Sequence, residues 1–153
     1  MEIELKLLIR PQDAAMLREL PLLHQYAAGP SHELHISDTY FDTARHQLKQ
    51  SGAGLRVRRV GDDYIQTLKA GGDANAGLHR RYEWESKVPT GQPDLAALRA
   101  MVDRKAPWSK LLRAPSIESS LAPIFQSHVT RTLWDLRLPD GDRIEFVLDI
   151  GKL

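Results

Sequence analysis

Polar and apolar residues alternate strictly at the start of the chain. Between residues 1 and 9 the odd positions are apolar, and the first three even positions are charged: Glu2, Glu4 and Lys6. Side chains two residues apart share a face of an extended chain, so this pattern predicts a β-strand with one apolar and one charged face. Pro11 ends the strand, and the residues that follow predict a short amphipathic helix ending before Pro21.

The same alternation returns later and predicts further strands, over residues 32–42, 55–60, 64–69, 80–87, 125–138 and 143–150. A loop of three residues that begins with Gly61 joins the clearest hairpin, between the second and third of these segments. Residues 94–102 and 108–112 instead place apolar side chains at helical spacing. The chain is therefore predicted to have an α+β fold, with an antiparallel sheet and short covering helices.

Two other segments are predicted to lie outside regular structure. Residues 43–54 form a polar connection that ends in a turn rich in glycine. Residues 71–77 are also rich in glycine, but they lack the Gly-Lys-Ser/Thr sequence of a phosphate-binding P-loop. We interpret this second segment as a mobile loop at the rim of the sheet.

Several predicted strands carry acids and bases together on one face, most densely over residues 81–87. A single face of this kind is ordinary, because antiparallel sheets commonly expose one side to water and form salt bridges across it. Its repetition favours a second interpretation, in which the strands curl into a barrel whose interior carries the charges and whose apolar side faces covering helices.

Composition narrows the classes of function. The chain has 153 residues, the size of one domain, with 21 Lys and Arg against 20 Asp and Glu and a net charge of +1. That balance argues against a general nucleic-acid binder. Cysteine is absent, which excludes disulfides and thiolate sites. No apolar run approaches the roughly 20 residues that cross a bilayer, so a cytoplasmic protein without membrane partners is predicted.

Acids and bases in one enclosure are typical of a site for a metal ion and a polyanion. Carboxylates can converge on a hard cation such as Mg²⁺ or Mn²⁺, while arginine and lysine bind phosphate oxygens. Phosphoryl transfer then needs positioning, charge neutralisation and an activated water, with no covalent nucleophile. The charged face therefore predicts a polyphosphate ligand with a divalent cofactor.

Several short motifs in the sequence resemble those of a known domain family. Glu2-Ile-Glu-Leu-Lys6 resembles the Glu-x-Glu-x-Lys signature of the CYTH domain, in the triphosphate tunnel metalloenzyme superfamily. Further matches follow in order: Tyr40-Phe-Asp-Thr43, Leu55-Arg-Val-Arg58, Thr67-Leu-Lys69, Arg81-x-Glu-x-Glu85, Arg131, and Glu145 with Asp149-x-Gly151. The resemblance covers essentially the whole chain. It implies an eight-stranded antiparallel β-barrel, a tunnel that binds triphosphate, with helices outside.

The resemblance also implies roles for individual residues. Catalysis would depend on Glu2, Glu4 and Lys6. The phosphate-binding set would be Lys6, Arg56, Arg58, Lys69, Arg81, Lys87 and Arg131. The metal, Mg²⁺ or Mn²⁺, would be held by a subset of the acids Glu2, Glu4, Glu83, Glu85, Glu145 and Asp149.

Within the superfamily, the pattern most resembles the bacterial inorganic triphosphatases, so we expect hydrolysis of inorganic triphosphate to pyrophosphate and phosphate. Adenylate cyclase, thiamine triphosphatase and a binding module that holds polyphosphate or nucleotide without hydrolysing it stay open, as does a homodimer. Family members continue past the Asp-x-Gly strand into a Glu-x-Glu strand, whereas this sequence ends at Leu153. We therefore expect residues 1–153 to be a truncated CYTH domain, and a helical CHAD domain is a candidate successor in the parent protein.

Overall fold

The computed structural model describes residues 2–75 and 78–152, with the side chains of Glu2, residues 73–80 and residue 107 outside that description. It contains one antiparallel sheet in the order β1-β5-β4-β3-β2-β6-β7. The strands are β1 (Glu2–Leu5), β2 (His32–Asp42), β3 (Ala53–Val60), β4 (Asp63–Asn75), β5 (Leu78–Val88), β6 (Ala122–Arg137) and β7 (Arg143–Lys152). The expected antiparallel sheet is therefore confirmed.

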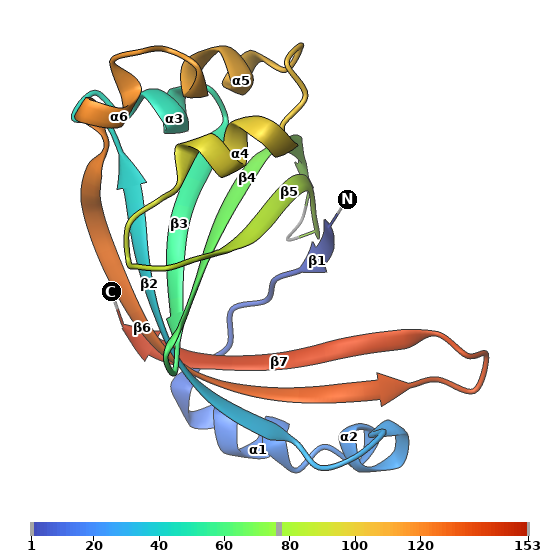
Figure 1. Cartoon of the computed structure of the whole chain (residues 1–153). Coiled ribbons are helices and arrows are strands. Elements are labelled where there is room, and N and C mark those ends of the chain that lie inside the picture. The colour runs from blue at the N-terminus through green and yellow to red at the C-terminus, as the bar shows by residue number, and fades with distance from the viewer. Residues whose placement is uncertain (1, 76–77, 153) are drawn as a thin grey trace.

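The expected closed barrel of eight strands is wrong for the described residues, which form seven strands and an open half-barrel (Figure 1). The physical reason is the pairing of the two edges. Strand β1 pairs only with β5 and strand β7 only with β6, so no ladder of hydrogen bonds joins the two edge strands. The sheet curls because antiparallel strands twist, and without that last ladder the curl stays open.

The glycine-rich segment expected as a rim loop is largely part of β4, which runs to Asn75. The register with β5 shifts between Ala70 and Asp73, and the two glycines between them have positive φ angles of 65° and 84°. Glycine adopts such angles without strain, so the segment forms a β-bulge instead of ending the strand. The end of the expected loop, residues 76–77, lies outside the described residues.

The helices are short and differ in part from expectation. They are η1 (Pro11–Asp13), α1 (Ala14–Arg18), α2 (Pro21–Tyr26), α3 (Gln47–Gln50), α4 (Leu95–Met101), α5 (Pro107–Leu112) and α6 (Ile117–Ser120). Pro21 begins a second helix as well as ending the first, since proline suits the first helical turn. The connection over residues 43–54 contains α3, whose four residues are too few for a periodic signal. None of the helices in residues 2–75 and 78–152 is long and apolar enough to cross a membrane.

Two apolar clusters fix the helices on the side of the sheet that carries its apolar residues. The larger one packs Leu48, Leu98, Leu112 and Ile117, from α3, α4, α5 and α6, against buried residues of β3 and β4. The smaller one packs Leu23 and other residues of the segment 9–27 against β6 and β7, where Trp134 and Phe146 meet edge to face at 5.7 Å. Figure 1 shows these helices at the two ends of the curled sheet.

Alternation along the strands then decides what the opposite side of the sheet carries. In β3, Leu55 and Val57 belong to the larger apolar cluster, so Arg56 and Arg58 project from the other side. We call this other side, which bears Arg56 and Arg58 and their cross-strand neighbours, the inner face. The predicted two-faced pattern is thus confirmed for β3, whereas the apolar residues Ile3 and Leu5 of β1 are exposed.

Candidate functional site

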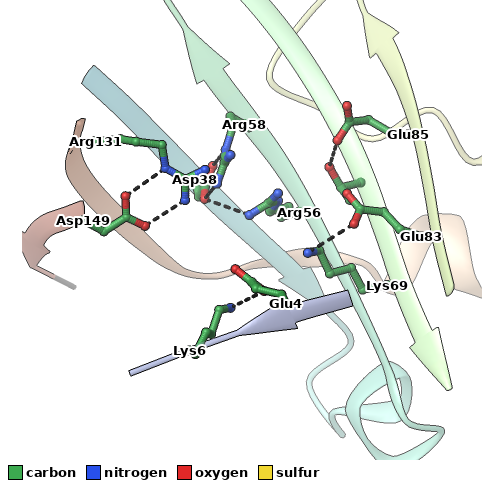
Figure 2. Close-up of polar contacts among 11 residues, drawn as sticks. Glu4, Lys6, Asp38, Arg56, Arg58, Lys69, Glu83, Glu85, Arg131 and Asp149 are labelled. Carbon is green, nitrogen blue, oxygen red and sulfur yellow. Dashed lines mark hydrogen bonds and ion pairs between the residues drawn. The ribbon is translucent and has the colours of Figure 1, made fainter. Parts of the chain in front are cut away.

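Strand register brings inner-face residues from different parts of the sequence into rows. One row crosses four strands, because Glu85 pairs with Thr67, Thr67 with Arg56, and Arg56 with Tyr40. Residues directly opposite each other in an antiparallel pair have Cβ atoms about 5 Å apart, so their side chains can interact. Figure 2 shows charged side chains from different strands gathered over the same part of the sheet.

Asp38 on β2 lies at the centre of the arginines of the inner face. Its carboxylate accepts two hydrogen bonds from Arg58, from Nε and Nη2, both at 2.8 Å. It also accepts one from Nη1 of Arg56 at 3.3 Å. The side chain of Asp38 is only 5% exposed, so two guanidinium groups from the neighbouring strand are held by one buried acid.

The ionisation of Arg58 reflects these surroundings. Burial by itself lowers the pKa of a guanidinium, because it penalises the charged form. Here the hydrogen bonds and the charge of Asp38, with smaller contributions from Tyr40 and Asp149, outweigh burial and raise the pKa of Arg58 above its ordinary value. Arg58 is therefore a permanent cation at any pH at which the protein would act.

A second bidentate pair lies on the next two strands. Arg131 on β6 donates from Nε and Nη2 to the two carboxylate oxygens of Asp149 on β7, at 2.8 and 2.7 Å. The two residues face each other in the register of these strands. Arg56, Arg58 and Arg131 thus face Asp38 and Asp149 across β2, β3, β6 and β7, and we call this part of the inner face the arginine half.

Glutamate and lysine dominate the other half, formed by β1, β4 and β5, which we call the glutamate half. Lys69 Nζ lies 3.3 Å from Glu83 Oε2 across β4 and β5, and Lys6 Nζ lies 3.3 Å from Glu4 Oε2. Glu85 accepts a hydrogen bond of 3.1 Å from the buried hydroxyl of Thr67. Each of these contacts engages one oxygen of its glutamate.

Arg56 carries an unsatisfied donor. Its Nε is buried and has no hydrogen-bond partner among the described residues. A buried N–H group without an acceptor is unfavourable, and native proteins rarely keep one unless water, an ion or a ligand supplies the acceptor. The inner face is therefore suited to a ligand rich in acceptor oxygens.

The acids of the inner face provide oxygen donors for a divalent cation. In the described residues, no three His, Asp or Glu side chains lie close enough together to form a metal site of their own. Mg²⁺ does not need such a cage, since it commonly takes one or two protein carboxylates and fills its remaining positions with water and substrate phosphates. Glu4, Glu83 and Glu85 supply the hard oxygen donors that such a cation prefers. The residues present fit a divalent cation that binds together with a phosphate.

Not all sequence-predicted site residues join this assembly. Lys87 pairs with Asp63 at 3.3 Å, and both side chains are well exposed. Glu145 is exposed and faces Asp135 on the β6–β7 hairpin, four residues and about 13 Å along the strand from Asp149. Arg81 is exposed at the position opposite Glu2 in the register of β1 and β5, and the side chain of Glu2 lies outside the described part of the chain.

Asp38 was missed by the sequence reasoning. It falls on the same strand face as Leu34, Ile36 and Tyr40, which are apolar or aromatic. The available signal was an acid in the middle of that face, because a charged residue flanked by apolar ones two positions away must either reach water or find a partner. Thr67, in a motif recognised from the sequence, also has a contact that was not foreseen, with Glu85.

Comparison with known proteins gives a consistent family. The family model for the CYTH domain matches residues 1–153. An inorganic triphosphatase from Haemophilus influenzae is 35% identical over 99% of this chain, and the chain spans 40% of the length of that relative.

Solved structures show a similar fold at lower identity. A protein from Hippeastrum with a dominant triphosphatase activity matches 99% of this chain and 73% of its own, with a TM-score of 0.66 and 17% identity. A Pyrococcus horikoshii protein matches 94% of this chain and 67% of its own, with a TM-score of 0.54 and 14% identity. With an open antiparallel sheet that gathers its charges on one face and a family model matched from end to end, this chain belongs to the CYTH domain family.

Proposed function

We propose that this domain binds inorganic triphosphate on its inner face and hydrolyses it to pyrophosphate and phosphate with the help of Mg²⁺ or Mn²⁺. The observation that supports this most directly is the buried Nε of Arg56, beside Asp38 and Arg58, which lacks an acceptor among the described residues. A phosphate oxygen is the acceptor that suits a guanidinium best, since the geometry allows paired hydrogen bonds. The triphosphatase activity of the Haemophilus relative agrees with this choice of substrate.

In this proposal the cations of the inner face neutralise the substrate. Arg56, Arg58, Arg131 and Lys69 are half-buried or better, so water screens their charges less than it would on an open surface. Lys6, Arg81 and Lys87 are the more exposed members of the predicted phosphate-binding set. We assign them to the outer phosphates and to capture of the substrate.

The acids would hold the divalent cation, and Glu4, Glu83 and Glu85 are the central candidates. The other acids predicted from the sequence are Glu2, Glu145 and Asp149, of which Glu145 lies away from the assembly. When bound, such a cation would supply charge neutralisation at phosphate oxygens and polarise the bond that breaks. The chain's own contribution is to hold the oxygens of the substrate with arginine and lysine while negative charge builds up on the leaving pyrophosphate. Glu4 is a candidate to accept the proton of the attacking water, because its second oxygen is not part of its pair with Lys6.

A small-molecule substrate, a cytoplasmic location and the absence of nucleic-acid partners belong to the same proposal. The near-neutral net charge and the lack of cysteine agree with them, since exported domains commonly carry disulfides.

The proposal is tested by release of phosphate from tripolyphosphate, ATP and thiamine triphosphate, each with Mg²⁺ or Mn²⁺. We expect tripolyphosphate to be the best substrate, and Arg56→Ala and Glu4→Gln each to lower the rate about 100-fold, the size of effect seen when one stabilising group is removed from a reacting centre. Arg143→Ala, which removes an exposed arginine on the β6–β7 hairpin, is the matched control and keeps the rate.

Two results would contradict the proposal. If both Arg56→Ala and Glu4→Gln still hydrolyse tripolyphosphate at the original rate, the inner face is not the site of the reaction. Tight metal-dependent binding of tripolyphosphate without release of phosphate would identify the domain as a binding module that does not hydrolyse its ligand.

A further inference from the structure

We propose that Asp38 and Asp149 are positioning residues, which fix Arg56, Arg58 and Arg131 in one arrangement for the substrate, and that Asp149 acts through Arg131 rather than as a metal ligand. This inference rests on the proposed function and deepens it. The acids of the inner face then fall into two groups. Asp38 and Asp149 position the arginines, and the glutamates bind the cation.

The five residues form an alternating line of charge across four neighbouring strands. Arg56 and Arg58 on β3 share Asp38 on β2, and Arg131 on β6 holds Asp149 on β7. The two groups are electrically connected, because Asp149 also contributes to the raised pKa of Arg58. Figure 2 shows Arg131 and Asp149 on one side of Asp38 and Arg56 on the other. The line therefore sets three guanidinium groups against two carboxylates.

The way each guanidinium is held leaves a defined edge for a ligand. Arg58 and Arg131 both use their Nε and Nη2 groups for the carboxylate. A guanidinium has five N–H groups in a rigid plane, so a bidentate pair along one edge fixes the direction of the remaining Nη1 group. Arg56 uses Nη1 instead, and its buried Nε has no acceptor among the described residues. Three donors are thus directed before any substrate binds.

Asp149 has little capacity left for a metal. Both of its oxygens accept short hydrogen bonds from Arg131, whereas Glu4 pairs with Lys6 and Glu85 with Thr67 through one carboxylate oxygen each. A cation approaching Asp149 would also meet the positive charge of two arginines, Arg131 and Arg58. Electrostatic repulsion then favours the glutamate half for the cation.

Gly151 gives independent support from the backbone. A Cβ atom built at Gly151 would collide with the carbonyl oxygen of His128 and would lie 2.9 Å from Val129 Cα, both on β6. Strand β7 can therefore lie this close to β6 only with glycine at position 151, which is two residues from Asp149 and on the same face. The close approach holds Asp149 directly opposite Arg131.

The acids could affect the binding of a polyanion by positioning the arginines or only by their charge, and the two explanations predict opposite changes in affinity. Removing a carboxylate raises the net charge of the inner face by one unit, which by itself strengthens the binding of a polyanion. If the acids instead order the arginines, their removal lets the guanidinium groups turn away and weakens binding, because the ordering must then be supplied when the ligand binds. The sign of the change in affinity thus decides between the two explanations.

The test uses Asp38→Asn and Asp149→Asn, which remove the charge and keep the shape of the side chain. We expect each to raise the Kd for tripolyphosphate, measured by calorimetry without metal, about tenfold. Asp135→Asn is the matched control, because it removes an exposed acid of β6 that pairs with Arg143, outside the line. Its Kd should match that of the unchanged protein. A lower Kd in both inner-face variants would overturn the positioning role.

The metal dependence separates Asp149 from the glutamates. We expect the Mg²⁺ concentration for half-maximal activity to rise in Glu4→Gln and to stay within about twofold in Asp149→Asn. A rise in Asp149→Asn as large as in Glu4→Gln would assign Asp149 to the metal and overturn the second part of the proposal.

Nuclear magnetic resonance of the arginine Nε–H groups measures how firmly each guanidinium is held, without any measurement of activity. In the unchanged protein, the Nε–H signals of Arg58 and Arg131 should be sharp and protected from exchange with water, because each is held by a carboxylate. Asp38→Asn should abolish protection of Arg58 alone, and Asp149→Asn that of Arg131 alone. Unchanged protection in both variants would overturn the positioning role. If the unchanged protein shows protected signals but neither binds nor hydrolyses tripolyphosphate, the proposed function fails while the positioning of the arginines stands.

Discussion

The arginine half and the glutamate half of the inner face differ in how firmly their charges are held. In the arginine half, Arg58 and Arg131 each bind a carboxylate through two hydrogen bonds, and the side chain of Asp38 is 5% exposed. In the glutamate half, Glu4 and Lys6 make a single contact, with 37% and 64% of their side chains exposed. Exposure alone does not separate the halves, because the side chain of Asp149 is 42% exposed and that of Glu83 is 21% exposed, so the difference lies in the paired hydrogen bonds of the arginines.

That difference suits two kinds of ligand. A phosphate group has fixed geometry, and donors that already point at its oxygens bind it without a cost of ordering. A hydrated divalent cation instead gathers carboxylates that can move to meet its octahedral geometry. We therefore expect the arginine half to be rigid and to bind phosphate, and the glutamate half to adapt to the metal ion.

The largest expected effect comes from breaking the centre of the arginine half. Asp38→Ala leaves two buried guanidinium groups without their shared acid, and removing one partner from a buried ion pair costs about 3 kcal/mol. The free energy of unfolding, measured with urea, should fall by about that amount. A loss below about 0.5 kcal/mol would show that water reaches these arginines and that the half is not rigid.

A backbone change in the same half should have the next largest effect. Gly151→Ala forces β7 away from β6, because the added methyl group meets the carbonyl oxygen of His128. Overpacking of this kind costs about 2 kcal/mol in the free energy of unfolding. Gly141→Ala in the β6–β7 turn is the comparison: its added Cβ meets nothing within 4 Å but its φ is +96°, so it reports the cost of backbone strain alone. Affinity for tripolyphosphate should fall in the first variant and not in the second.

The glutamate half should tolerate substitution much better. Glu4→Gln removes one exposed ion pair, and such pairs contribute less than about 1 kcal/mol to the free energy of unfolding. Stability measured without metal should therefore be almost unchanged, although the requirement for Mg²⁺ increases. A loss of stability as large as that of Asp38→Ala would remove the distinction between the two halves.

The smallest effect concerns pH. Arg58 has a raised pKa in the folded protein, and such a group contributes its full stabilisation below its unfolded pKa and loses it only as the pH rises through the higher folded value. The loss of stability in Arg58→Met should therefore be the same at about pH 6 and about pH 10. A loss of stability in Arg58→Met that differs between the two pH values would show that Arg58 titrates in this range.

Much of the fold was visible in the sequence because it depends on local alternation. Strand β2 has the predicted limits, and the β3–β4 hairpin follows from two β-rich runs around Gly61. Its turn is shorter than expected, since β4 already begins at Asp63. These features depend on period and turn chemistry, which are properties of neighbouring residues.

Features that depend on register and on side-chain capture of the backbone were not visible. Asp42 is an example: its carboxylate accepts hydrogen bonds from the backbone N–H groups of Thr43, Leu48 and Lys49 and so supports the short helix α3. No spacing rule predicts a helix of four residues that depends on one buried acid. The role of Asp38 likewise depends on its position opposite Arg58, which only the register of β2 and β3 defines.

The order of the strands has a consequence for how the protein folds. Strand β5 pairs with β1, and β2 with β6, so Glu2 meets Arg81 and His32 meets Leu133. Contacts between residues so far apart in the chain close late and slow the search for the native state. The inner face draws on both pairings, so we expect it to assemble late in folding. Binding of tripolyphosphate would therefore be a sensitive reporter of refolding, since it would register only molecules with every strand in place.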